Sequence, residues 1–279
     1  MRILISCDME GISGIVDWKQ TQSGESEWER CRRLMMGDVN AAVNAAFEVG
    51  VDEVAVTDAH ANGRNLMIEE LDPRAALNSG AISPFSMMEG IGDKPGYDAV
   101  IFVGYHARAR TKDAILCHTW SDVVADVWLN NIQVGEIGLN AATAGYFGVP
   151  VIAISGDKAA CLEARGLLGE DICTAIVKEA SSRYAAKCLP LTEARQRICI
   201  AVTQGLGALK AKRNLKSLLF NKPVKLNVDY MYPNQADLAS IVPGAQRQDA
   251  TRVLFEAEDV LEAIRAFQAM TNLASAYQR

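Results

Sequence analysis

Short hydrophobic runs alternate with amphipathic stretches along much of the chain. Residues 3–7 form an apolar run, residues 34–47 space their apolar side chains for one buried helix face that stops at Gly50, and residues 53–58 form the next run. A strand, a helix and a strand of these lengths predict a parallel β-α-β unit. Residues 26–29 have the Ser-x-x-Glu form of a capping box, which predicts that the helix begins there.

The same alternation continues downstream. Residues 99–104 are continuously apolar, as expected for a strand buried on both faces. Residues 126–129 and 132–134 flank an Asn-Asn pair, which favours a two-residue hairpin turn. The other predicted elements are helices over 138–147, 157–166, 192–210 and 260–274, and strands over 149–154, 174–177, 224–228 and 252–255.

This order of elements predicts an α/β fold with a mostly parallel sheet, flanking helices and a smaller α+β C-terminal portion. With 279 residues, the chain is long enough for one large domain or two smaller ones. The pattern of elements changes beyond about residue 190. We therefore expect an α/β domain over residues 1–190, which carries the functional site, and a smaller α+β domain over residues 191–279.

Composition excludes several classes of partner. The formal net charge of -6 argues against a nucleic-acid-binding protein, because phosphate binding needs a concentrated positive surface. No stretch approaches the roughly 18 apolar residues that a membrane span needs, and the acid at position 8 comes too early for a signal peptide. The 7 cysteines lack CxxC spacing, which is typical of reduced thiols. We expect a cytoplasmic protein without membrane or nucleic-acid partners.

Metal-binding side chains follow the predicted strands. Asp8 and Glu10 follow the first strand, and His60 and His106 follow two others. Glu136 follows the predicted hairpin. Because ligands of open parallel sheets bind beyond the carboxyl ends of the strands, we expect these side chains to lie close together. Neighbouring carboxylates repel each other unless a cation neutralises them, so the five residues together predict a site for two divalent metal ions.

Each of these residues also has an ordinary structural explanation when it is taken alone. Asp8 and Glu10 could be loop acids, and a histidine that follows a strand could bond to the backbone of a turn. Glu136 could be an acid at a helix N-terminus, where the helix dipole favours it. His118, the third histidine of the chain, fits an acid–base or nucleophilic group beside the metals, or a plain structural histidine. The joint pattern is what favours a metal site.

Five ordered motifs carry a resemblance to a known peptidase family. They are Ser6–Gly14, Asp58–His60, Ser83–Gly90, Gly104–Ala109 and Gly135–Ala141. In these motifs the sequence resembles the zinc D-aminopeptidases encoded in bacterial dipeptide-transport operons. Weaker similarity continues toward the C-terminus, so the resemblance covers most of the chain.

The resemblance implies a two-zinc peptidase that assembles as a ring-type homo-oligomer, a decamer in the family. Carried over position by position, it implies that Asp8 bridges the two metal ions, with Glu10, His60, His106 and Glu136 as the other ligands. Manganese or cobalt would also suit such a set of carboxylates and imidazoles.

The resemblance also implies that His118 matches the catalytic nucleophile proposed for the family. A proton shuttle beside a metal-activated water is the alternative role. The segment between His106 and His118 departs from the family pattern by one extra residue and is more basic. Its Arg108 and Arg110 predict a preference for a substrate carboxylate.

The leading hypothesis is therefore a binuclear metal-dependent aminopeptidase. It would release N-terminal residues, of D or L configuration, from short peptides or amino acid amides. A two-metal amidase or phosphoesterase of a small metabolite is the alternative, in which Arg108 or Arg110 would bind the phosphate. A metal-binding or structural subunit without enzymatic activity is the third hypothesis.

Overall fold

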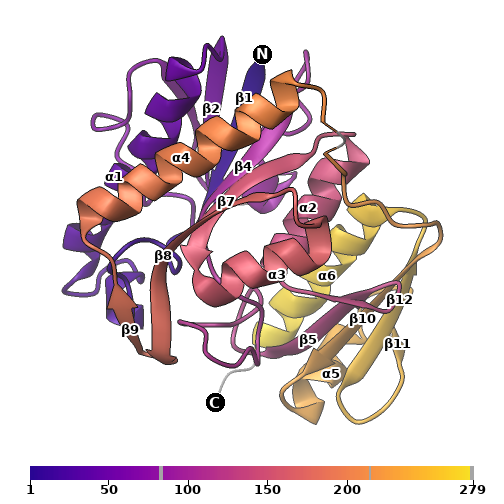
Figure 1. The fold of residues 1–279 in the computed structure, drawn as a ribbon. Helices are drawn as coiled ribbons and strands as arrows, with labels where there is room; N and C mark the ends of the chain where they lie inside the picture. Colours follow the sequence, from indigo (N-terminus) through magenta and orange to yellow (C-terminus); the bar gives the residue numbers. More distant parts are fainter. Residues whose placement is uncertain (82–83, 214, 277–279) are drawn as a thin grey trace.

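The strands of the described residues form two sheets, one of seven strands and one of five. Figure 1 shows their arrangement in a computed structural model. The structure describes residues 1–81, 84–213 and 215–276. Ser83, the first residue of one of the five sequence motifs, lies outside the described residues. The mixed architecture with a mostly parallel sheet confirms the predicted α/β fold class.

The seven-stranded sheet has the order β3-β2-β1-β4-β7-β8-β9 and is parallel from β3 to β8. Its last strand, β9, pairs with β8 in the antiparallel direction. The parallel β1–β2 pair confirms the predicted β-α-β unit. The strands are β1 (Arg2–Cys7), β2 (Glu53–Asp58), β3 (Ala75–Asn78), β4 (Ala99–Tyr105), β7 (Val151–Asp157), β8 (Cys173–Ser182) and β9 (Ala185–Cys188).

Helices cover both faces of this sheet. Helices α1 (Trp28–Glu48) and α4 (Leu191–Lys210) lie side by side over one face, in front of the strands in Figure 1. Helices α2 (Glu136–Tyr146) and α3 (Lys158–Leu168) pack against the other face. All residues of the central strand β4 are buried, which explains its continuous apolar sequence.

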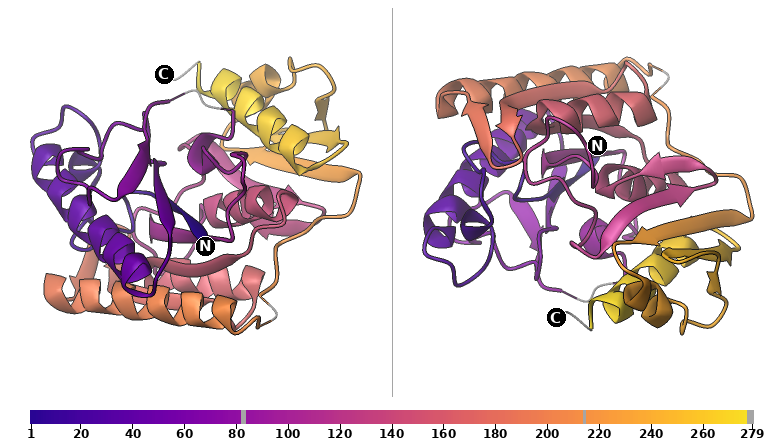
Figure 2. Two further views of the ribbon diagram at one scale, coloured as in Figure 1. Left: turned by 90° about the horizontal axis from the view of Figure 1, so that it is seen from above. Right: turned by 90° about the horizontal axis from the view of Figure 1, so that it is seen from below.

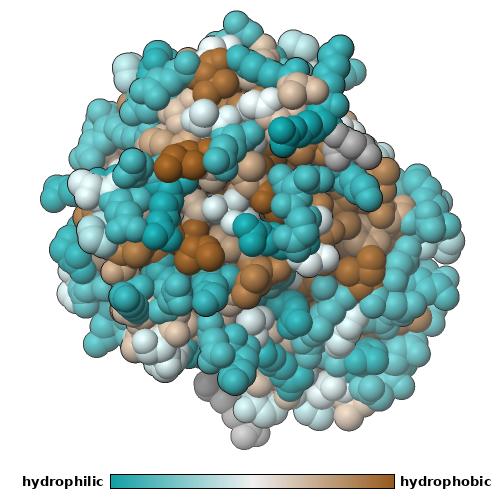
Figure 3. Space-filling model, viewed as in Figure 1, coloured by the Kyte–Doolittle hydropathy of each residue, from teal (hydrophilic) through white to brown (hydrophobic). Residues whose placement is uncertain are grey.

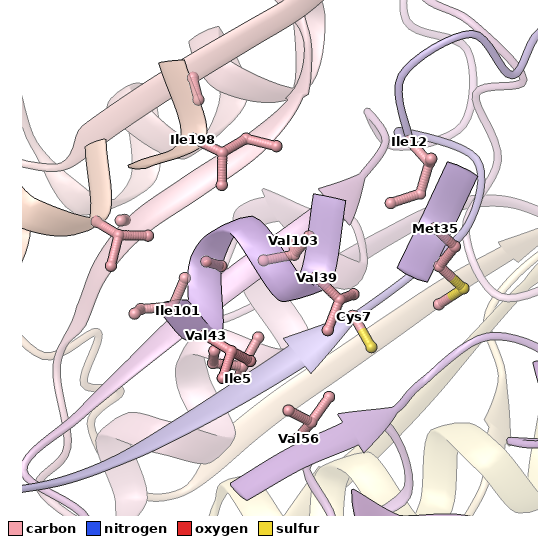
Figure 4. Packing of buried hydrophobic residues seen from close by; sticks show 14 of the residues in the cluster. Ile5, Cys7, Ile12, Met35, Val39, Val43, Val56, Ile101, Val103 and Ile198 are labelled. Atoms are coloured by element: carbon pink, nitrogen blue, oxygen red, sulfur yellow. The ribbon is translucent and has the colours of Figure 1, made fainter. Parts of the chain in front are cut away.

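The larger core lies between the sheet and the α1–α4 layer. Figure 4 shows Ile5 and Cys7 of β1 close to Val39 and Val43 of α1, and Ile198 of α4 belongs to the same cluster. These five side chains are at most 1% exposed. Each fully buried aliphatic side chain stabilises the fold by about 1.5–3 kcal/mol. The carboxyl end of β1 is therefore held by a well-packed core.

The five-stranded sheet is antiparallel and has the order β11-β12-β10-β5-β6. The predicted Asn130-Asn131 turn is confirmed, because both residues have the positive φ angles, 46° and 67°, that a tight hairpin turn requires. The sheet packs with α5 and α6 as a second layer system beside the first sheet (Figure 2). Its elements are β5 (Val124–Leu129), β6 (Ile132–Val134), β10 (Val224–Tyr230), α5 (Pro233–Ala239), β11 (Gln246–Arg247), β12 (Arg252–Ala257) and α6 (Val260–Ser275).

Helix α2 joins the two sheets. Its Ile137, Ala141 and Ala144 side chains belong to the core beneath the parallel sheet. Its Leu139 and Ala142 side chains belong to the core of the antiparallel sheet. A helix that is apolar on all sides is one that is buried on all sides. The first residue of α2 is consequently fixed relative to both sheets.

Strand pairing does not follow the predicted division of the chain at residue 190. Strands β5 and β6 precede that residue but join β10 in the antiparallel sheet. Helix α4 follows that residue but packs in the core of the parallel sheet. The division into domains 1–190 and 191–279 stays a prediction, because sheet membership does not test whether either part folds alone.

The predicted capping box at the start of α1 is wrong. The N-cap residue is Glu27, which makes no side-chain capping hydrogen bond. Its Oε2 instead accepts a hydrogen bond from Gln20 Nε2 at 3.0 Å, in the preceding loop. The hydrophobic pattern also missed β3, β9, β11, α5 and the 3-10 helices η1 (Trp18–Gln20) and η2 (Ser86–Met88), all of them short.

The surface shows little continuous apolar area on the face drawn in Figure 3, where hydrophilic residues predominate and hydrophobic residues occupy separate areas. Within residues 1–81, 84–213 and 215–276, none of the helices has both the length and the apolar character to cross a membrane.

Candidate metal centre

Three adjacent parallel strands bring the predicted ligands to one edge of the sheet. Asp8 directly follows β1, His106 directly follows β4, and His60 comes two residues after β2. Strand β1 lies between the other two, so the three side chains meet. Glu10 follows in the loop after β1, and Glu136 is the first residue of α2. All five residues are buried, with His60 the most exposed at 9%.

The first group of donor atoms consists of Asp8, Glu10 and His60. His60 Nδ1 lies 3.2 Å from Asp8 Oδ1 and 3.1 Å from Glu10 Oε2. The other ring nitrogen, Nε2, lies 3.0 Å from the carbonyl oxygen of Thr21. Because a carbonyl oxygen can only accept, His60 Nε2 carries a proton, and Nδ1 faces the carboxylates. In the neutral ring, Nδ1 would have a lone pair for a cation.

The second group consists of His106, His118 and Glu136. His106 Nε2 lies 3.4 Å from Glu136 Oε1 and 3.3 Å from Asp8 Oδ2. His106 Nδ1 donates to the carbonyl oxygen of Ala107 at 2.9 Å, so its Nε2 also presents a lone pair. Asp8 therefore turns one carboxylate oxygen toward each group, which is the arrangement of a bridging carboxylate.

His118 lies at the edge of the second group. Its Nε2 is 3.7 Å from Glu136 Oε1, and its ring stacks on His106 with the centroids 4.1 Å apart. His118 Nδ1 donates to the carbonyl oxygen of Leu116 at 2.9 Å, so Nε2 is again the free nitrogen. The Trp18 ring meets the His118 ring edge-on, with the centroids 5.2 Å apart.

Two backbone hydrogen bonds fix the segment that carries His118. The backbone N–H of Ile115 donates to Asp157 Oδ2 at 2.8 Å. The next N–H, of Leu116, donates to the carbonyl oxygen of Arg183 at 3.0 Å. Asp157 ends β7 and Arg183 follows β8, so the parallel sheet anchors this segment too.

Two glycines allow the β1 and β4 ends to approach. Gly104 has φ +71°, and a Cβ atom there would clash with the backbone oxygen of Asp8. A Cβ atom on Gly11 would clash with the backbone of Gly104 and Tyr105. The backbone N–H of Gly11 donates to the carbonyl oxygen of Gly104 at 2.8 Å. The absence of side chains at these two positions is what lets Asp8 lie within reach of His106.

Burial and mutual repulsion dominate the electrostatics of the carboxylates. Burial, together with the neighbouring Glu10 carboxylate, raises the pKa of Asp8 to about 7. Burial also acts to raise the pKa of Glu10, but the His60 imidazole outweighs it and lowers that pKa well below its usual range. Buried carboxylates this close together need a positive charge between them.

The histidines respond in two ways. Burial disfavours their charged forms, but the carboxylates raise the pKa values of His60 and His106 well above the usual value. For His118 the effects of burial and of the neighbouring His106 prevail, and its pKa is lowered. Without metal ions, protonated His60 and His106 would neutralise the buried carboxylates. Two bound cations would supply this positive charge instead, and both imidazoles could then stay neutral.

The residues fit a pair of metal ions. Asp8 Oδ2, Glu10 Oε2 and His106 Nε2 are buried and have no hydrogen-bond partner. Buried polar atoms are normally satisfied, so three without a partner within the two donor groups indicate that a partner is missing. In each group the donor atoms lie within 4.8 Å of one another. Each imidazole is oriented by a backbone carbonyl, which is the usual outer support of a metal-bound histidine.

A cavity of about 610 Å³ opens above both groups. Its walls include Trp18, Trp120 and Met87, and α6 contributes Gln268 and Asn272 from the far side. The sequence patterns gave no signal for the two α6 residues, because polar residues on an amphipathic helix are normally assigned to solvent.

The basic segment lies away from this cavity. Arg110 forms an ion pair with Asp126 on β5 at 2.8 Å. The backbone N–H of Arg108 donates to Glu163 Oε2. Neither arginine lines the cavity, and the described lining residues include no lysine or arginine. The expectation that Arg108 or Arg110 meets a substrate carboxylate or phosphate in the cavity is therefore not supported by their positions.

The fold and the site together define a class. It consists of α/β proteins in which the ends of parallel strands deliver two metal-ligand groups, joined by a shared carboxylate, to the floor of an open cavity. In hydrolases, such paired sites activate water and polarise the bond to be cleaved.

Comparison with known proteins identifies the family within this class. Residues 1–269 match the family model Peptidase_M55, described as D-aminopeptidase. The chain is 39% identical over 275 residues to a D-aminopeptidase of Bacillus subtilis (strain 168), covering 98% of each protein. The chain therefore belongs to the D-aminopeptidase family Peptidase_M55, and it is a hydrolase.

The fold agrees with this family. The chain is similar to a solved structure described as the Zn-dependent D-aminopeptidase DppA from Bacillus subtilis, a self-compartmentalizing protease. The TM-score is 0.95, the identity is 38%, and both chains are covered completely. The resemblance inferred from the five sequence motifs is confirmed.

Proposed function

We propose that this chain is a binuclear metal-dependent aminopeptidase that releases N-terminal residues, including D residues, from short peptides or amino acid amides. The observation that carries the proposal is the orientation of the imidazoles. Each of the three donates one ring nitrogen to a backbone carbonyl and turns the other toward buried carboxylates. In this orientation the second ring nitrogen of each histidine can bind a cation, which is the usual geometry of a metal-bound histidine.

We assign the ligands from the two groups. Asp8, which turns one carboxylate oxygen toward each group, would be shared by the two ions; Glu10 and His60 would complete the first set, and His106 and Glu136 would complete the second. Zinc is the proposed metal because imidazole and carboxylate donors suit it and because the similar DppA is described as Zn-dependent. Manganese or cobalt would fit the same donors.

His118 acts at the reacting atoms in this proposal. When bound, the paired ions supply Lewis acidity at the scissile carbonyl and lower the pKa of water. The lowered pKa of His118 keeps its imidazole neutral near pH 7, so that Nε2 can accept a proton. The bond from Nδ1 to Leu116 holds that nitrogen toward the cavity, from which the proton can pass to the departing amine. Direct nucleophilic attack by Nε2 would use the same geometry.

We further propose a ring-type homo-oligomer in the cytoplasm, with the decamer as the expected size. Support for the assembly comes from the similar DppA, which is described as self-compartmentalizing. Support for the compartment comes from the cysteines, all seven of which are free. A closed ring would restrict substrates to short peptides.

The phosphoesterase alternative has weaker support. A phosphate substrate needs cationic side chains beside the metals, and the described lining residues of the cavity offer carboxamides and hydroxyls instead. Carboxamide and hydroxyl groups suit the amide groups of a peptide, because they both donate and accept hydrogen bonds.

The test combines metal analysis with a substrate screen. The purified protein is analysed for bound metal and assayed on D- and L-aminoacyl amides, dipeptides and a generic phosphate ester, before and after chelation. We expect two ions per chain and release of an N-terminal residue that is lost on chelation and restored by zinc. Metal binding with phosphate-ester hydrolysis alone would favour the alternative, and a protein that binds no metal would overturn the proposal.

A further inference from the structure

A lysine is buried on β8, the sixth of the seven strands in the sheet order, and the hydrogen bonds of its ammonium to described residues go to backbone carbonyls rather than to a carboxylate. Lys178 is on β8, and it is 1% exposed, among the largest fully buried side chains of the described residues. Lysine is almost never fully buried unless its charge is satisfied. The position of Lys178 therefore calls for an explanation beyond packing.

All three hydrogen bonds of the ammonium go to one loop. Lys178 Nζ donates to the backbone carbonyl oxygens of Glu10 at 2.6 Å, Ile12 at 2.8 Å and Ile15 at 2.6 Å. An ammonium group has three donors, so the set is complete. The carbonyl oxygen of Ile12 also accepts from the backbone N–H of Ile15 at 3.2 Å, whereas Lys178 is the hydrogen-bond partner that the described residues offer the carbonyls of Glu10 and Ile15. Leaving a buried carbonyl without a partner costs free energy.

This loop carries the first group of metal-ligand atoms. Residues 8–15 leave the end of β1, and Glu10, Ile12 and Ile15 are at most 1% exposed. Two other long-range hydrogen bonds hold this loop: the backbone N–H of Gly11 donates to the carbonyl oxygen of Gly104 at 2.8 Å, and that of Ser13 donates to Asp38 Oδ2 at 2.9 Å. Among the described residues, the bond from Lys178 is the one that holds the carbonyl of Glu10 itself. The carbonyl held by Lys178 and the carboxylate that faces His60 belong to the same residue, Glu10.

We propose that Lys178 is a positioning residue for the first metal-ligand group, fixing the backbone of Glu10 so that its carboxylate meets His60 and Asp8 at the distance a cation requires. Lys178 does not line the cavity and does not touch the substrate. Its effect passes through the β1 loop. This inference rests on the proposed metal-dependent function.

The second group does not depend on Lys178 in the same way. Glu136 is fixed by α2, and His106 by the end of β4. The Lys178→Met variant keeps an unbranched side chain of nearly the same length and removes the ammonium. We expect it to weaken the binding of one metal ion per chain by about 10-fold to 100-fold, as loss of an outer support of a ligand does, and to leave the other ion in place.

The primary readout is metal affinity, measured by competition with a fluorescent chelator on the full-length protein with zinc alone. A secondary readout is activity against zinc concentration, in which the midpoint should shift by the same factor while kcat at saturating zinc recovers. A lysine with only a structural role would lower the melting temperature and leave both midpoints unchanged.

Two controls separate positioning from general damage. Lys158→Met removes a lysine that is 52% exposed and paired with Glu179 next to Lys178, so it tests the substitution itself. Leu226→Ala weakens the core of the antiparallel sheet and tests the effect of lost stability. Neither should change the affinity of either ion.

The outcomes are distinguishable. If the wild-type protein binds no zinc, the proposed function fails together with this inference. If the wild-type protein binds two ions and Lys178→Met binds both with unchanged affinity, only the role of Lys178 is overturned. Should Lys178→Met fail to fold, Lys178→Arg serves instead. It keeps the charge and should retain more affinity for the weaker ion than Lys178→Gln.

Discussion

The two sheets of this chain differ in what the ends of their strands carry. In the parallel sheet, three neighbouring strands point the same way, so Asp8, His60 and His106 meet at one edge. In the antiparallel sheet, neighbouring strands point in opposite directions, and the described strand residues supply none of the metal-ligand atoms. Parallel pairing therefore places the candidate ligands of neighbouring strands at one edge of the sheet. The antiparallel sheet contributes indirectly, because it packs against α2, which begins with Glu136, and against α6, which lines the cavity.

The largest effect should follow a change at the shared carboxylate. Asp8→Asn keeps the shape of the side chain but removes the charge that faces both donor groups. We expect weaker binding of both ions and a loss of kcat/KM greater than about 100-fold, because a direct ligand matters more than its outer supports. Metal content and hydrolysis of a D-aminoacyl amide check this.

Asp126→Asn is the matched control in the antiparallel sheet. It removes the charge that pairs with the exposed Arg110, an ion pair of the kind worth about 0–1 kcal/mol, and keeps an oxygen that can accept the hydrogen bond from Gln133 Nε2. If Asp8→Asn and Asp126→Asn lost equal amounts of bound metal, the proposal that the parallel sheet alone carries the metal ligands would be contradicted.

The next largest effect should come from a change at His118. This residue does not follow a strand directly, and its segment is held to the parallel sheet by hydrogen bonds to Asp157 and Arg183. His118→Gln should lower kcat by about 10²-fold to 10⁴-fold, the range for a positioned acid–base group, with both ions retained. Rate measurements and metal analysis are made on the same preparation. Loss of one ion would instead make His118 a ligand of the second group, and unchanged kcat would exclude a role at the reacting atoms.

A smaller effect is expected where the C-terminal layer meets the cavity. Gln268→Ala and Asn272→Ala each remove a carboxamide from the wall. A lost hydrogen bond to substrate costs about 0.5–1.5 kcal/mol, so kcat/KM should fall by at most about 10-fold, mainly through KM. Steady-state kinetics on a dipeptide series test this. Arg265→Ala, on an exposed face of α6, is the control, and an equal change there would mean that the effect is not local.

The smallest effect on activity should follow damage to the antiparallel core. Leu226→Ala should cost about 2–5 kcal/mol of unfolding free energy, as large-to-small core changes do, and leave kcat unchanged at temperatures where the protein is folded. Urea unfolding and kinetics measure the two quantities. Ile5→Ala, in the core behind Asp8, should lower both stability and metal affinity, and equal behaviour of the two variants would contradict the division of roles.

The sequence predicted the centre of the site because the signals there are local. A hydrophobic run followed by an acid or a histidine predicts a strand with a candidate ligand at its end. The structure confirms the strands before Asp8, His60 and His106 and brings the three side chains together, and their role as ligands stays a prediction. The Asn130-Asn131 turn was predictable for the same reason, since two residues specify its backbone. Glu136 was predicted as a ligand by its place after the hairpin, and in the structure it begins α2.

What the sequence missed depends on contacts between distant segments. Lys178 lies within a strand beside an exposed acid, and only the pairing of β8 with β7 places it under a loop more than a hundred residues earlier. The capping box failed because the helix begins one residue later, with Glu27 rather than Ser26 as the N-cap residue. Membership of β5 in the antiparallel sheet depends on β10, and no local pattern records that partner.

The pairing of β5 with β10 also sets an order of events during synthesis. Trp128 is synthesised long before Asn227, the residue that pairs with it on β10. One edge of the β5–β6 hairpin therefore stays unpaired until β10 has been synthesised, whereas all strands of the seven-stranded sheet precede β10 in the sequence. Helix α6, which closes the cavity, emerges later still. A chain that ends before α6 thus contains all five candidate ligands and still lacks the cavity wall to which Gln268 and Asn272 belong.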